Sequence, residues 1–465
     1  MSPLRTLTVA IAATLASACT MIPEYQRPAA PVPASFPNAP QVASATPADA
    51  IAWRDYFVNA QLRQVIALAL ANNRDLRVAA LNIEQARAQY RIQRADLFPS
   101  VGAIGEQTAQ RLPGELTSSG EAGISRQYNA TIGFSSYELD FFGRIRSLNA
   151  AALEQYLGTE EARRSAQISL VAEVAGTWLT LAFDNERLAL ARSTYETRQK
   201  SHDLIRRSFE AGVVSALDLN QSQQLLQSAR ADVARYNSFA AQDENALALV
   251  VGAPVPADLL PATLTDTVSA VAELPTGVPS DVLTQRPDIL QAERALRAAN
   301  ASIGAARAAF FPSITLTAAA GTASSTMDGL FSGGSGAWSF IPQIRIPVFE
   351  AGRLQASLDV AEVQRDINVA QYEKAIQSAF REVADALADR ASLAERLDAR
   401  RQQVEATQAA FHLSDARYKG GADSYLGLLD AQRSRYLAEQ ELIIVRLADA
   451  ANRVTLYKVL GGGWG

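Results

Sequence analysis

Few side chains in this sequence of 465 residues could carry covalent or metal chemistry. Cys19 is the only cysteine, and the two histidines, His202 and His412, have no second metal ligand four residues further on. A zinc site needs three or four His, Cys or carboxylate ligands, and a Cys/His nucleophile needs a neighbouring base. No GxSxG nucleophile motif occurs either. We therefore predict that the chain catalyses no reaction and holds no metal or other cofactor.

Cys19 follows a segment typical of secretory signals. Arg5 gives a charged start, Leu7 to Leu15 form an apolar run, and residues 16–18 are small, so residues 1–18 are expected to be a signal peptide. The segment that ends in Cys19 resembles the bacterial lipoprotein signal, which predicts a covalent diacylglycerol on the thiol and an N-acyl or palmitoyl chain. Each buried methylene contributes about 0.8 kcal/mol to membrane binding, so several chains would anchor the protein firmly. The alternative is an ordinary signal peptide with an unrelated cysteine.

Charge and hydropathy restrict the partners. The 43 basic and 48 acidic side chains are interspersed and give a net charge of -5, so nucleic acid is not an expected partner. With 48% hydrophobic residues the chain can bury sizeable cores. Beyond the signal we expect no apolar stretch of about 18 residues, the length that a membrane-spanning helix needs. Any membrane crossing is therefore expected from β-strands.

The helices and strands expected in this sequence occur twice in the same order, which indicates an internal duplication. Each half reads as helix, strand, loop, strand, long helix, turn and long helix. We expect the anchor and an extended, proline-rich, unpacked tether at 19–50, repeats at 51–253 and 283–465, and a connector at 254–282. Four landmarks recur in order: Asn73-Arg74-Asp75-Leu76 with Arg286-Pro287-Asp288-Ile289, Phe98-Pro99-Ser100 with Phe311-Pro312-Ser313, Phe142-Gly143-Arg144 with Ala351-Gly352-Arg353, and Phe209-Glu210-Ala211-Gly212 with Tyr418-Lys419-Gly420-Gly421.

The predicted long helices are unusual in length. Residues 353–419 contain neither Gly nor Pro. A coiled-coil seam with 4-3-4 spacing runs through Ile376, Phe380, Val383 and Leu387. A helix of roughly 65 residues would be about 100 Å long, far more than a membrane thickness. The other long helices are expected at 145–209, 217–250 and 426–460.

Two segments, at 128–135 and 338–346, show the period-two alternation of barrel strands, with one apolar and one polar face. The segments that precede them, at 101–110 and 314–324, alternate less cleanly and are also expected to be strands. Four strands cannot close a membrane barrel, and an open edge in lipid would leave backbone groups without partners. A dimer would supply eight strands with a filled interior, whereas a trimer would supply twelve and leave room for solute. We therefore predict a homotrimer.

Several short motifs also occur in a fixed order. They are residues 19–28 (CTMIPEYQRP), 68–76 (LALANNRDL), 274–275 (LP), 277–280 (GVPS), 286–289 (RPDI), 298–307 (AANASIGAAR) and 423–433 (DSYLGLLDAQR). With the duplication, they resemble the TolC-like outer-membrane efflux family, specifically its lipidated OprM/NodT branch, over nearly the whole mature chain. The resemblance implies a mainly α fold with a small transmembrane β-barrel portion. Three copies would form a 12-stranded barrel and a long periplasmic α-helical barrel, with residues 254–282 and the chain ends in an equatorial belt.

The resemblance also implies a function. The chain would be the outer-membrane channel of a tripartite efflux pump, a passive duct that exports small molecules such as drugs or other toxic compounds from a Gram-negative bacterium. Its partners would be its own copies, a periplasmic adaptor (membrane fusion) protein, an inner-membrane pump of the RND type, and outer-membrane lipid. The alternative is a duct for type I protein secretion. Two other classes of protein, a purely structural coiled-coil lipoprotein and an envelope hydrolase, would account for fewer of these motifs.

In the family the periplasmic end closes near the second helical turn, and the resemblance assigns this gate to Leu426 and Asp430. Four residues apart, they would share one helix face and form two stacked rings around a threefold axis. The leucines would dewet the pore and the carboxylates would select against anions, with Arg433 compensating their repulsion. Gly427 stands where some members carry a second aspartate, so a doubled acidic ring is in doubt. The alternative reading of Asp430 is a solvated surface acid.

Two turns, Gly212-Val213-Val214-Ser215 and Gly421-Ala422-Asp423-Ser424, each offer a glycine to end one helix and a serine to cap the next. The resemblance implies that Gly212, Val213, Ser215, Gly421, Ala422 and Ser424 contact the adaptor. By contrast, Arg286-Pro287-Asp288 is interpreted as structural, because proline at a helix start with an acid in the first turn is ordinary helix chemistry.

Overall fold

The computed structural model of the chain describes residues 20–37, 51–117, 120–264 and 280–463, without the side chains of 281 and 282. The expected signal peptide, Cys19, residues 38–50 of the expected tether and residues 265–279 of the expected connector lie outside the described residues. The lipid anchor and the bounds of the signal peptide, the tether and the connector therefore stay predictions.

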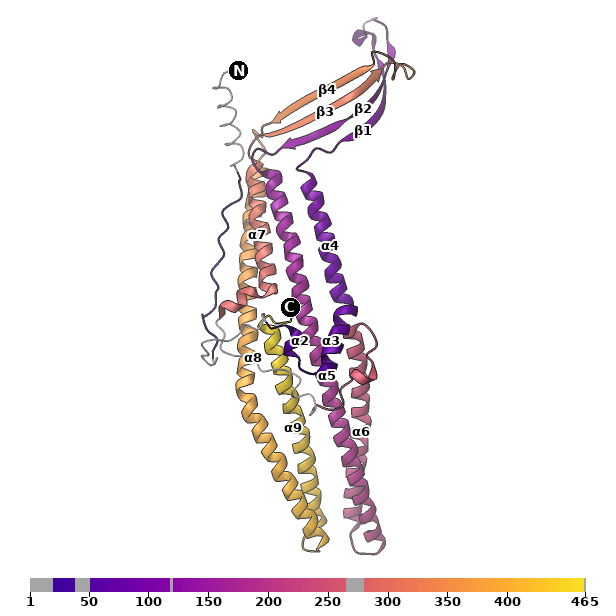
Figure 1. Cartoon of the computed structure of the whole chain (residues 1–465), viewed down its shortest axis with the longest axis vertical. Helices are drawn as coiled ribbons and strands as arrows, with labels where there is room; N and C mark the ends of the chain where they lie inside the picture. The colour runs from indigo at the N-terminus through magenta and orange to yellow at the C-terminus, as the bar shows by residue number, and fades with distance from the viewer. Residues whose placement is uncertain (1–19, 38–50, 118–119, 265–279, 464–465) are drawn as a thin grey trace. The chain divides into compact units, whose positions relative to one another are not determined.

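Helices and strands follow the same order twice along the chain (Figure 1). The short α2 (Trp53–Tyr56) and α3 (Ala60–Asn72) come first, and the 3-10 helices η2 (Gly114–Leu116), η3 (Ala257–Leu259) and η5 (Ser280–Gln285) lie in the connections. The expected order is confirmed, and each long helix begins and ends within a residue of its expected position. The first series is α4 (Arg74–Ala95), β1 (Gly102–Leu112), β2 (Gly123–Leu139), α5 (Arg144–Glu210) and α6 (Ala216–Val251); the second is α7 (Pro287–Ala308), β3 (Ser313–Ser324), β4 (Gly336–Arg345), α8 (Arg353–Lys419) and α9 (Tyr425–Val459).

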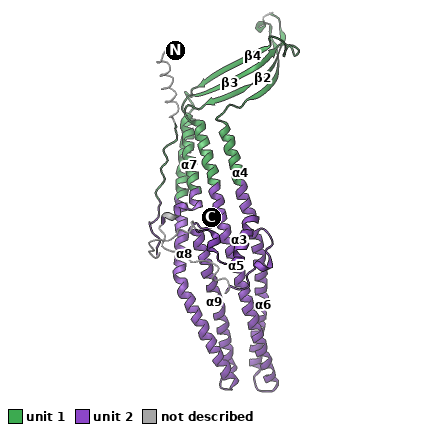
Figure 2. Cartoon of the chain, viewed as in Figure 1, with its two compact units in different colours: residues 1–29, 82–159, 291–372 green, residues 30–81, 160–290, 373–465 purple. Residues whose placement is uncertain are grey.

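The chain divides into two compact units (Figure 2). Unit 1 holds the four strands with the adjoining parts of α4, α5, α7 and α8, and unit 2 holds α6, α9 and the remaining parts of α5 and α8. Each unit thus takes segments from both halves of the sequence, so a sequence repeat is not a compact unit. Unit 1 comprises the described parts of residues 1–29, 82–159 and 291–372, and unit 2 those of 30–81, 160–290 and 373–465.

The four expected segments are strands and form one antiparallel sheet in the order β1-β2-β3-β4. β2 pairs with β3 and so joins the two series. Gly133 and Gly321 lie at this pairing, where an added Cβ would stand 2.1 Å from a carbonyl oxygen of the facing strand. Only glycine fits such an approach. Within the described chain β1 and β4 are the edges of the sheet.

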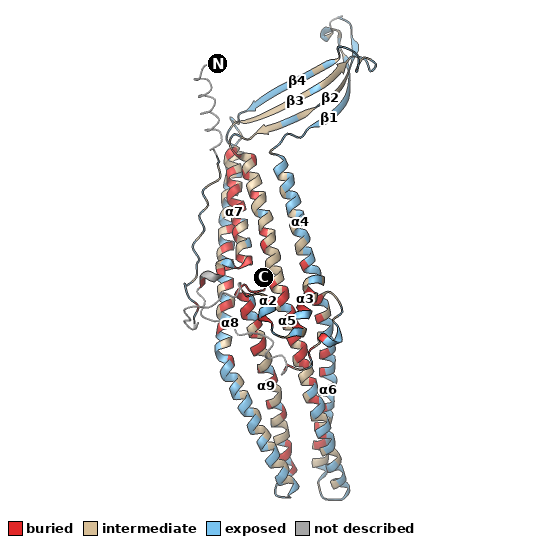
Figure 3. Cartoon of the chain, viewed as in Figure 1, coloured by how far each residue is buried: buried red, intermediate tan, exposed pale blue. Residues whose placement is uncertain are grey.

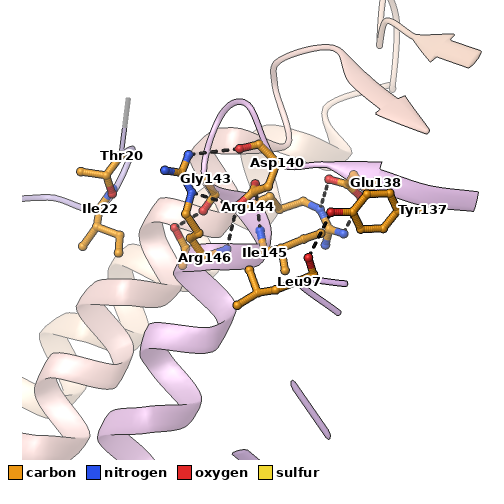
Figure 4. A network of polar contacts seen from close by, with 11 residues as sticks. Thr20, Ile22, Leu97, Tyr137, Glu138, Asp140, Gly143, Arg144, Ile145 and Arg146 are labelled. Atoms are coloured by element: carbon orange, nitrogen blue, oxygen red, sulfur yellow. Dashed lines mark hydrogen bonds and ion pairs between the residues drawn. The ribbon is translucent and has the colours of Figure 1, made fainter. Parts of the chain in front are cut away.

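Polar contacts hold the turn from β2 into α5 (Figure 4). The carboxylate of Asp140 accepts hydrogen bonds from the backbone N–H groups of Ile145 (3.1 Å) and Arg146 (2.8 Å). It thereby satisfies donors that the first turn of any helix leaves without partners. Arg144 donates two hydrogen bonds, of 2.9 and 2.7 Å, to the carboxylate of Glu138 at the end of β2. These contacts fix the point at which strand becomes helix.

The predicted seam of α8 is confirmed, since Ile376, Val383 and Leu387 are all buried. The buried residues of unit 2 follow stripes along its long helices and leave other faces exposed (Figure 3). Phe380 is half-buried and stacks on Phe36, with 4.9 Å between ring centroids. Long helices are therefore stabilised here by narrow apolar seams.

One expectation about α5 was wrong. A window of this helix has a mean hydropathy of 1.3 and the length and composition that a membrane span requires. Half of that window (50%) is buried inside the chain. α5 buries Val171, Val174 and Trp178, and the indole N–H of Trp178 donates to the carbonyl of Leu259 (3.0 Å). This apolar surface serves the packing of the helix within unit 2.

Residues 20–37 contain no helix or strand, as expected, but they are not a free tether. Asn300 of α7 donates to the carbonyl of Pro23 (2.8 Å), and the hydroxyl of Tyr25 donates to Glu293 (3.1 Å). Phe36 is buried. The expectation of an unpacked tether is therefore corrected, because aromatic side chains between the prolines find partners on the body of the protein.

Candidate functional site

Both long hairpins turn at a glycine in the left-handed conformation. Gly212, after α5, has φ of 75°, and Gly421, after α8, has φ of 71°. In the first turn the N–H of Val213 donates to the carbonyl of Ser208 (2.8 Å) and that of Gly212 to Phe209 (2.9 Å). The second turn repeats this pair of hydrogen bonds. Both are Schellman turns, and the glycine helix ends predicted from the sequence are confirmed.

The serines that follow these turns differ. Ser215 accepts a hydrogen bond from the backbone N–H of Asp218 (3.2 Å), whose carboxylate accepts one from the N–H of Ser215 (3.1 Å). This is a complete capping box. The side chain of Ser424 caps nothing, and Gly427 stands where α6 has Asp218. The predicted serine cap is therefore right for Ser215 and wrong for Ser424, whose helix lacks the reciprocal carboxylate.

The second turn is held by an ion pair instead. Arg417 donates to both carboxylate oxygens of Asp423, at 2.6 and 2.8 Å. This hydrogen-bonded guanidinium lowers the pKa of Asp423. The six residues expected to contact an adaptor are all exposed, which is compatible with that role: Gly212, Val213, Ser215, Gly421, Ala422 and Ser424.

An apolar cluster beneath the turns packs the two hairpins together. Tyr425, Leu428 and Leu429 of α9 are buried against Ile205 of α5 and Leu225 of α6. Because helical residues one turn apart share a face, this cluster determines which side of α9 points away from the other helices. The open side is the one that carries the expected gate.

Leu426 and Asp430 lie on that open side of α9, one turn apart. The side chain of Leu426 is 57% exposed, Asp430 is exposed, and Arg433 is partly buried. Asp430 and Arg433 form no ion pair with each other in the described chain. The structure thus brings Leu426 and Asp430 together as the spacing predicts, and leaves Arg433 without the compensating contact inside one protomer.

A polar network behind this face escaped the sequence analysis. Arg198 of α5 is buried, donates to the carbonyl of Leu225 (3.1 Å), and lies 5.1 Å over the ring of Tyr436. The hydroxyl of Tyr436 donates to Asp232 (3.1 Å). Burial lowers the pKa of Arg198 and raises that of Tyr436. A cavity of about 100 Å³ adjoins Arg198 and Tyr436.

The position of Arg198 in the heptad pattern of α5 is the sequence signal that could have identified it as buried. Ala191 and Ile205 stand seven residues before and after it, and both are buried. A charged residue in the phase of core residues indicates a buried contact with its own partners.

The Arg286-Pro287-Asp288 motif has the structural role expected of it. Pro287 begins α7. Arg286 is mostly buried and donates to Asp288 (2.7 and 3.0 Å), to Glu382 of α8 (2.9 Å), and to the carbonyl of Val459 at the end of α9 (2.7 Å). It therefore fastens three helices together in unit 2.

The two histidines lie in different surroundings: His412 is exposed, and His202 contacts a neighbouring helix. Nδ1 of His202 lies 2.8 Å from the hydroxyl of Ser222 in the neighbouring helix. Among the residues that the structure describes, no three His, Cys, Asp or Glu side chains are grouped to hold a metal ion.

The chain is similar over nearly its whole length to known outer-membrane efflux proteins. The outer membrane efflux protein family matches residues 65–253 and again 278–462. The toluene efflux pump outer membrane protein TtgC and the antibiotic efflux pump outer membrane protein ArpC, both of Pseudomonas putida, are each 51% identical over 462 residues, which cover 98% of this chain and 95% of theirs. The open-state MtrE outer membrane channel of Neisseria gonorrhoeae superposes with a TM-score of 0.86 at 40% identity, covering 96% of this chain and 99% of that one.

Two long helical hairpins that end in glycine turns, together with a four-stranded antiparallel sheet, define a TolC-like channel subunit. The chain belongs to the outer membrane efflux protein family. Its function is that of an outer-membrane efflux channel, and the family consists of ducts rather than enzymes. The fold and function expected from the resemblance are thereby confirmed.

Proposed function

We propose that three copies of the chain form a passive duct through which an inner-membrane pump exports small organic molecules. The observation that carries this proposal is the sheet, whose edge strands β1 and β4 have no partner strand in the described chain. In lipid, unpaired strand edges are too costly to persist, so the edges of neighbouring copies must pair. Three copies give twelve strands, enough to leave a channel.

The names of the relatives support a cargo class. TtgC is named for toluene and ArpC for antibiotics, and both match this chain nearly from end to end. We infer that this chain serves a pump for apolar or amphipathic small molecules. The pump, of the RND type, and a periplasmic adaptor would supply the energy and select the cargo, and the adaptor would bind the exposed tip residues Gly212, Val213, Ser215, Gly421, Ala422 and Ser424.

We infer that Leu426 and Asp430 form the periplasmic gate. Their exposure on the one open face of α9 supports this role, since a side chain buried in its own protomer could not line a pore. Rings of three leucines would exclude water, and rings of three aspartates would repel anions and one another. Arg433, one turn further on, would offset that repulsion across the threefold axis.

We further propose that Cys19 carries a diacylglycerol and an N-acyl chain, which hold the N-terminus in the outer membrane. The packing of residues 20–37 along α7 and α8 supports a defined path from such an anchor. Mass spectrometry of the mature N-terminal peptide tests this directly. An unmodified cysteine, or cleavage at another site, would refute the anchor and leave the channel proposal standing.

Single-channel conductance in planar bilayers tests the duct and its gate. We expect wild type to be mostly closed and the double variant Leu426→Ala, Asp430→Ala to conduct far more. Leu437→Ala, which shortens an equally exposed leucine further along α9, is the matched control and should stay closed. Equal conductance of wild type and double variant would reject the gate residues. No conductance from any well-folded protein would reject the duct.

A further inference from the structure

Unit 2 contains a buried cation whose charge no carboxylate balances. Arg198 of α5 is 6% exposed, and its polar contacts within the described residues are the carbonyl of Leu225 (3.1 Å) and the ring of Tyr436, whose centroid is 5.1 Å away. Neither partner is an anion. Burial, together with the nearby charge of Arg433, lowers the pKa of Arg198. A buried guanidinium is costly unless an anion compensates it, so this position favours the arrival of one.

The neighbouring carboxylates are already engaged with other donors. Asp232 of α6 accepts a hydrogen bond from the hydroxyl of Tyr436 (3.1 Å) and pairs with Arg235 (2.8 Å). Glu439 of α9 pairs with Arg435 (2.8 Å). Neither carboxylate forms an ion pair with Arg198 in the described part of the chain. An anionic partner for Arg198 therefore has to come from outside the chain.

The second half of the sequence shows that this type of helical hairpin does not require the charge. The Gly-Arg pairs that begin α5 and α8 stand as far apart as the glycines that end these helices, so Thr407 is the counterpart of Arg198. The hydroxyl of Thr407 donates to the carbonyl of Gln403 in its own helix (2.9 Å). A small neutral residue thus suffices at the equivalent position, and the buried arginine serves a purpose particular to α5.

A cavity of about 100 Å³ adjoins Arg198 between α5, α8 and α9. Arg198, Arg435 and Thr194 bring hydrogen-bond donors to its wall, whereas Leu190 and Phe411 bring apolar surface. All of these residues belong to unit 2. The cavity therefore places a short apolar wall beside the uncompensated cation.

The size and charge of the cavity define the ligand that fits. A protein cavity of about 150 Å³ accepts benzene, so this one fits a molecule that is somewhat smaller. The planar guanidinium of Arg198 matches the two oxygens of a carboxylate. Glu439, which also lines the cavity, would repel a dianion such as phosphate, and Leu190 and Phe411 favour a short hydrocarbon chain.

We propose that this cavity binds a small monoanionic carboxylate such as propionate, with its carboxylate on Arg198 and its chain against Leu190 and Phe411. The bound anion contacts α5 together with α8 and α9, and so holds the two long hairpins to each other at this level. The inference does not depend on the trimer or on the gate of the proposed function, because every residue that it uses lies in unit 2 of one chain.

Equilibrium dialysis of the full-length protein against radiolabelled propionate tests the site. We expect saturable binding of one propionate per chain. Unlabelled propionate should displace the label, phosphate should displace it far less, and neutral propionamide should not displace it. Stronger displacement by phosphate than by propionate would overturn the assignment to a carboxylate. The absence of saturable binding would overturn the site itself.

Two variants link that binding to the cavity. Arg198→Met removes the charge at similar side-chain length and should weaken propionate binding at least tenfold. Thr194→Leu fills the cavity while Arg198 stays in place, and it should abolish binding; it decides the matter if circular dichroism shows Arg198→Met to be unfolded. The matched control is Arg206→Met, because Arg206 is an arginine of α5 that is 53% exposed and paired with Asp203 (3.4 Å). Wild-type affinity in Thr194→Leu would contradict the inference.

Thermal unfolding gives a second readout. A ligand that binds only the folded state raises the unfolding temperature. Propionate should therefore stabilise wild type and Arg206→Met, and should leave the unfolding temperature of Thr194→Leu unchanged. An equal rise in all three proteins would mean that the salt acts elsewhere on the chain, and the proposed site would fall.

Discussion

The guanidinium of Arg286, at the start of α7, lies 2.9 Å from the carboxylate of Glu382 in α8 and also binds the last carbonyl of α9. Removing it would leave a buried carbonyl and two carboxylates without their donor. Since both carboxylates are partly exposed, we expect Arg286→Ala to lower the free energy of unfolding by roughly 2–4 kcal/mol. Thermal unfolding followed by circular dichroism measures this.

The control for that variant is Arg381→Ala. Arg381 lies in the same stretch of α8 but is 77% exposed and 3.9 Å from Asp385. Exposed pairs of this kind contribute about 0–1 kcal/mol, so this change should leave the unfolding temperature nearly unaltered. Equal effects of the two variants would show that Arg286 does not fasten the helices.

Two carboxyl groups meet between α5 and α6. Asp184 is buried and pairs with Arg187 at 3.5 Å, while one oxygen of Asp243 is buried without a donor. Burial, and then the neighbouring Asp184, raise the pKa of Asp243 to about 6. The folded chain therefore holds a proton that the unfolded chain, with a pKa of about 3.9, releases. This contribution to stability is full below pH about 4 and is lost as pH rises through about 6.

Asp243→Asn tests this pair. The variant should unfold at a higher temperature than wild type at neutral pH and at nearly the same temperature near pH 4. Asp385→Asn, at an exposed position, should show no such pH-dependent difference. If the unfolding temperatures of wild type and Asp243→Asn differed by the same amount at every pH, Asp243 would not hold an extra proton in the folded chain.

The serines that precede α6 and α9 make a matched pair. Ser215→Ala removes a capping box, so we expect a loss of about 1 kcal/mol in the stability of its helix end. Ser424→Ala should change almost nothing, because its hydroxyl caps no N–H. Chemical unfolding of both variants decides the point, and equal losses would mean that the two tips are capped alike.

Gly133 offers a test of the sheet. An alanine there would place its Cβ 2.1 Å from the carbonyl oxygen of Ala318, a backbone atom that cannot move aside. We expect Gly133→Ala to reduce the yield of folded protein in the outer membrane several-fold. Gly123→Ala, where nothing lies within 4 Å, should fold normally. Normal yield from Gly133→Ala would mean that β2 and β3 can separate at this point.

The sequence predicted the long helices almost to the residue, because nothing but a glycine turn interrupts them. It also predicted the four strand segments and the shared face of Leu426 and Asp430, which depend on local spacing. The packing of Phe36 on Phe380 could not be predicted, since a contact between residues so far apart has no periodic signal. Arg198 has a heptad signal for burial, but its partner Tyr436 lies on another helix and could not be predicted.

Ser424 and α5 illustrate a second limit. A serine before a helix favours a cap, yet the reciprocal carboxylate must also be present, and Gly427 supplies none. The apolar surface of α5 has the length of a membrane span, and only its partners in unit 2 reveal that it is a core surface. Local sequence patterns indicate which structures a segment can adopt, whereas its contacts with other segments determine which of these it adopts.

The ion pair between Arg294 of α7 and Glu154 of α5 joins the two halves of the sequence. Ala151 packs beside this pair against Ala298 and Ala301, so the first and second halves of the sequence share one apolar contact. Either half on its own would leave that contact open to solvent and one charge without its partner. The duplicated halves therefore depend on each other for folding, although each repeats the same order of elements.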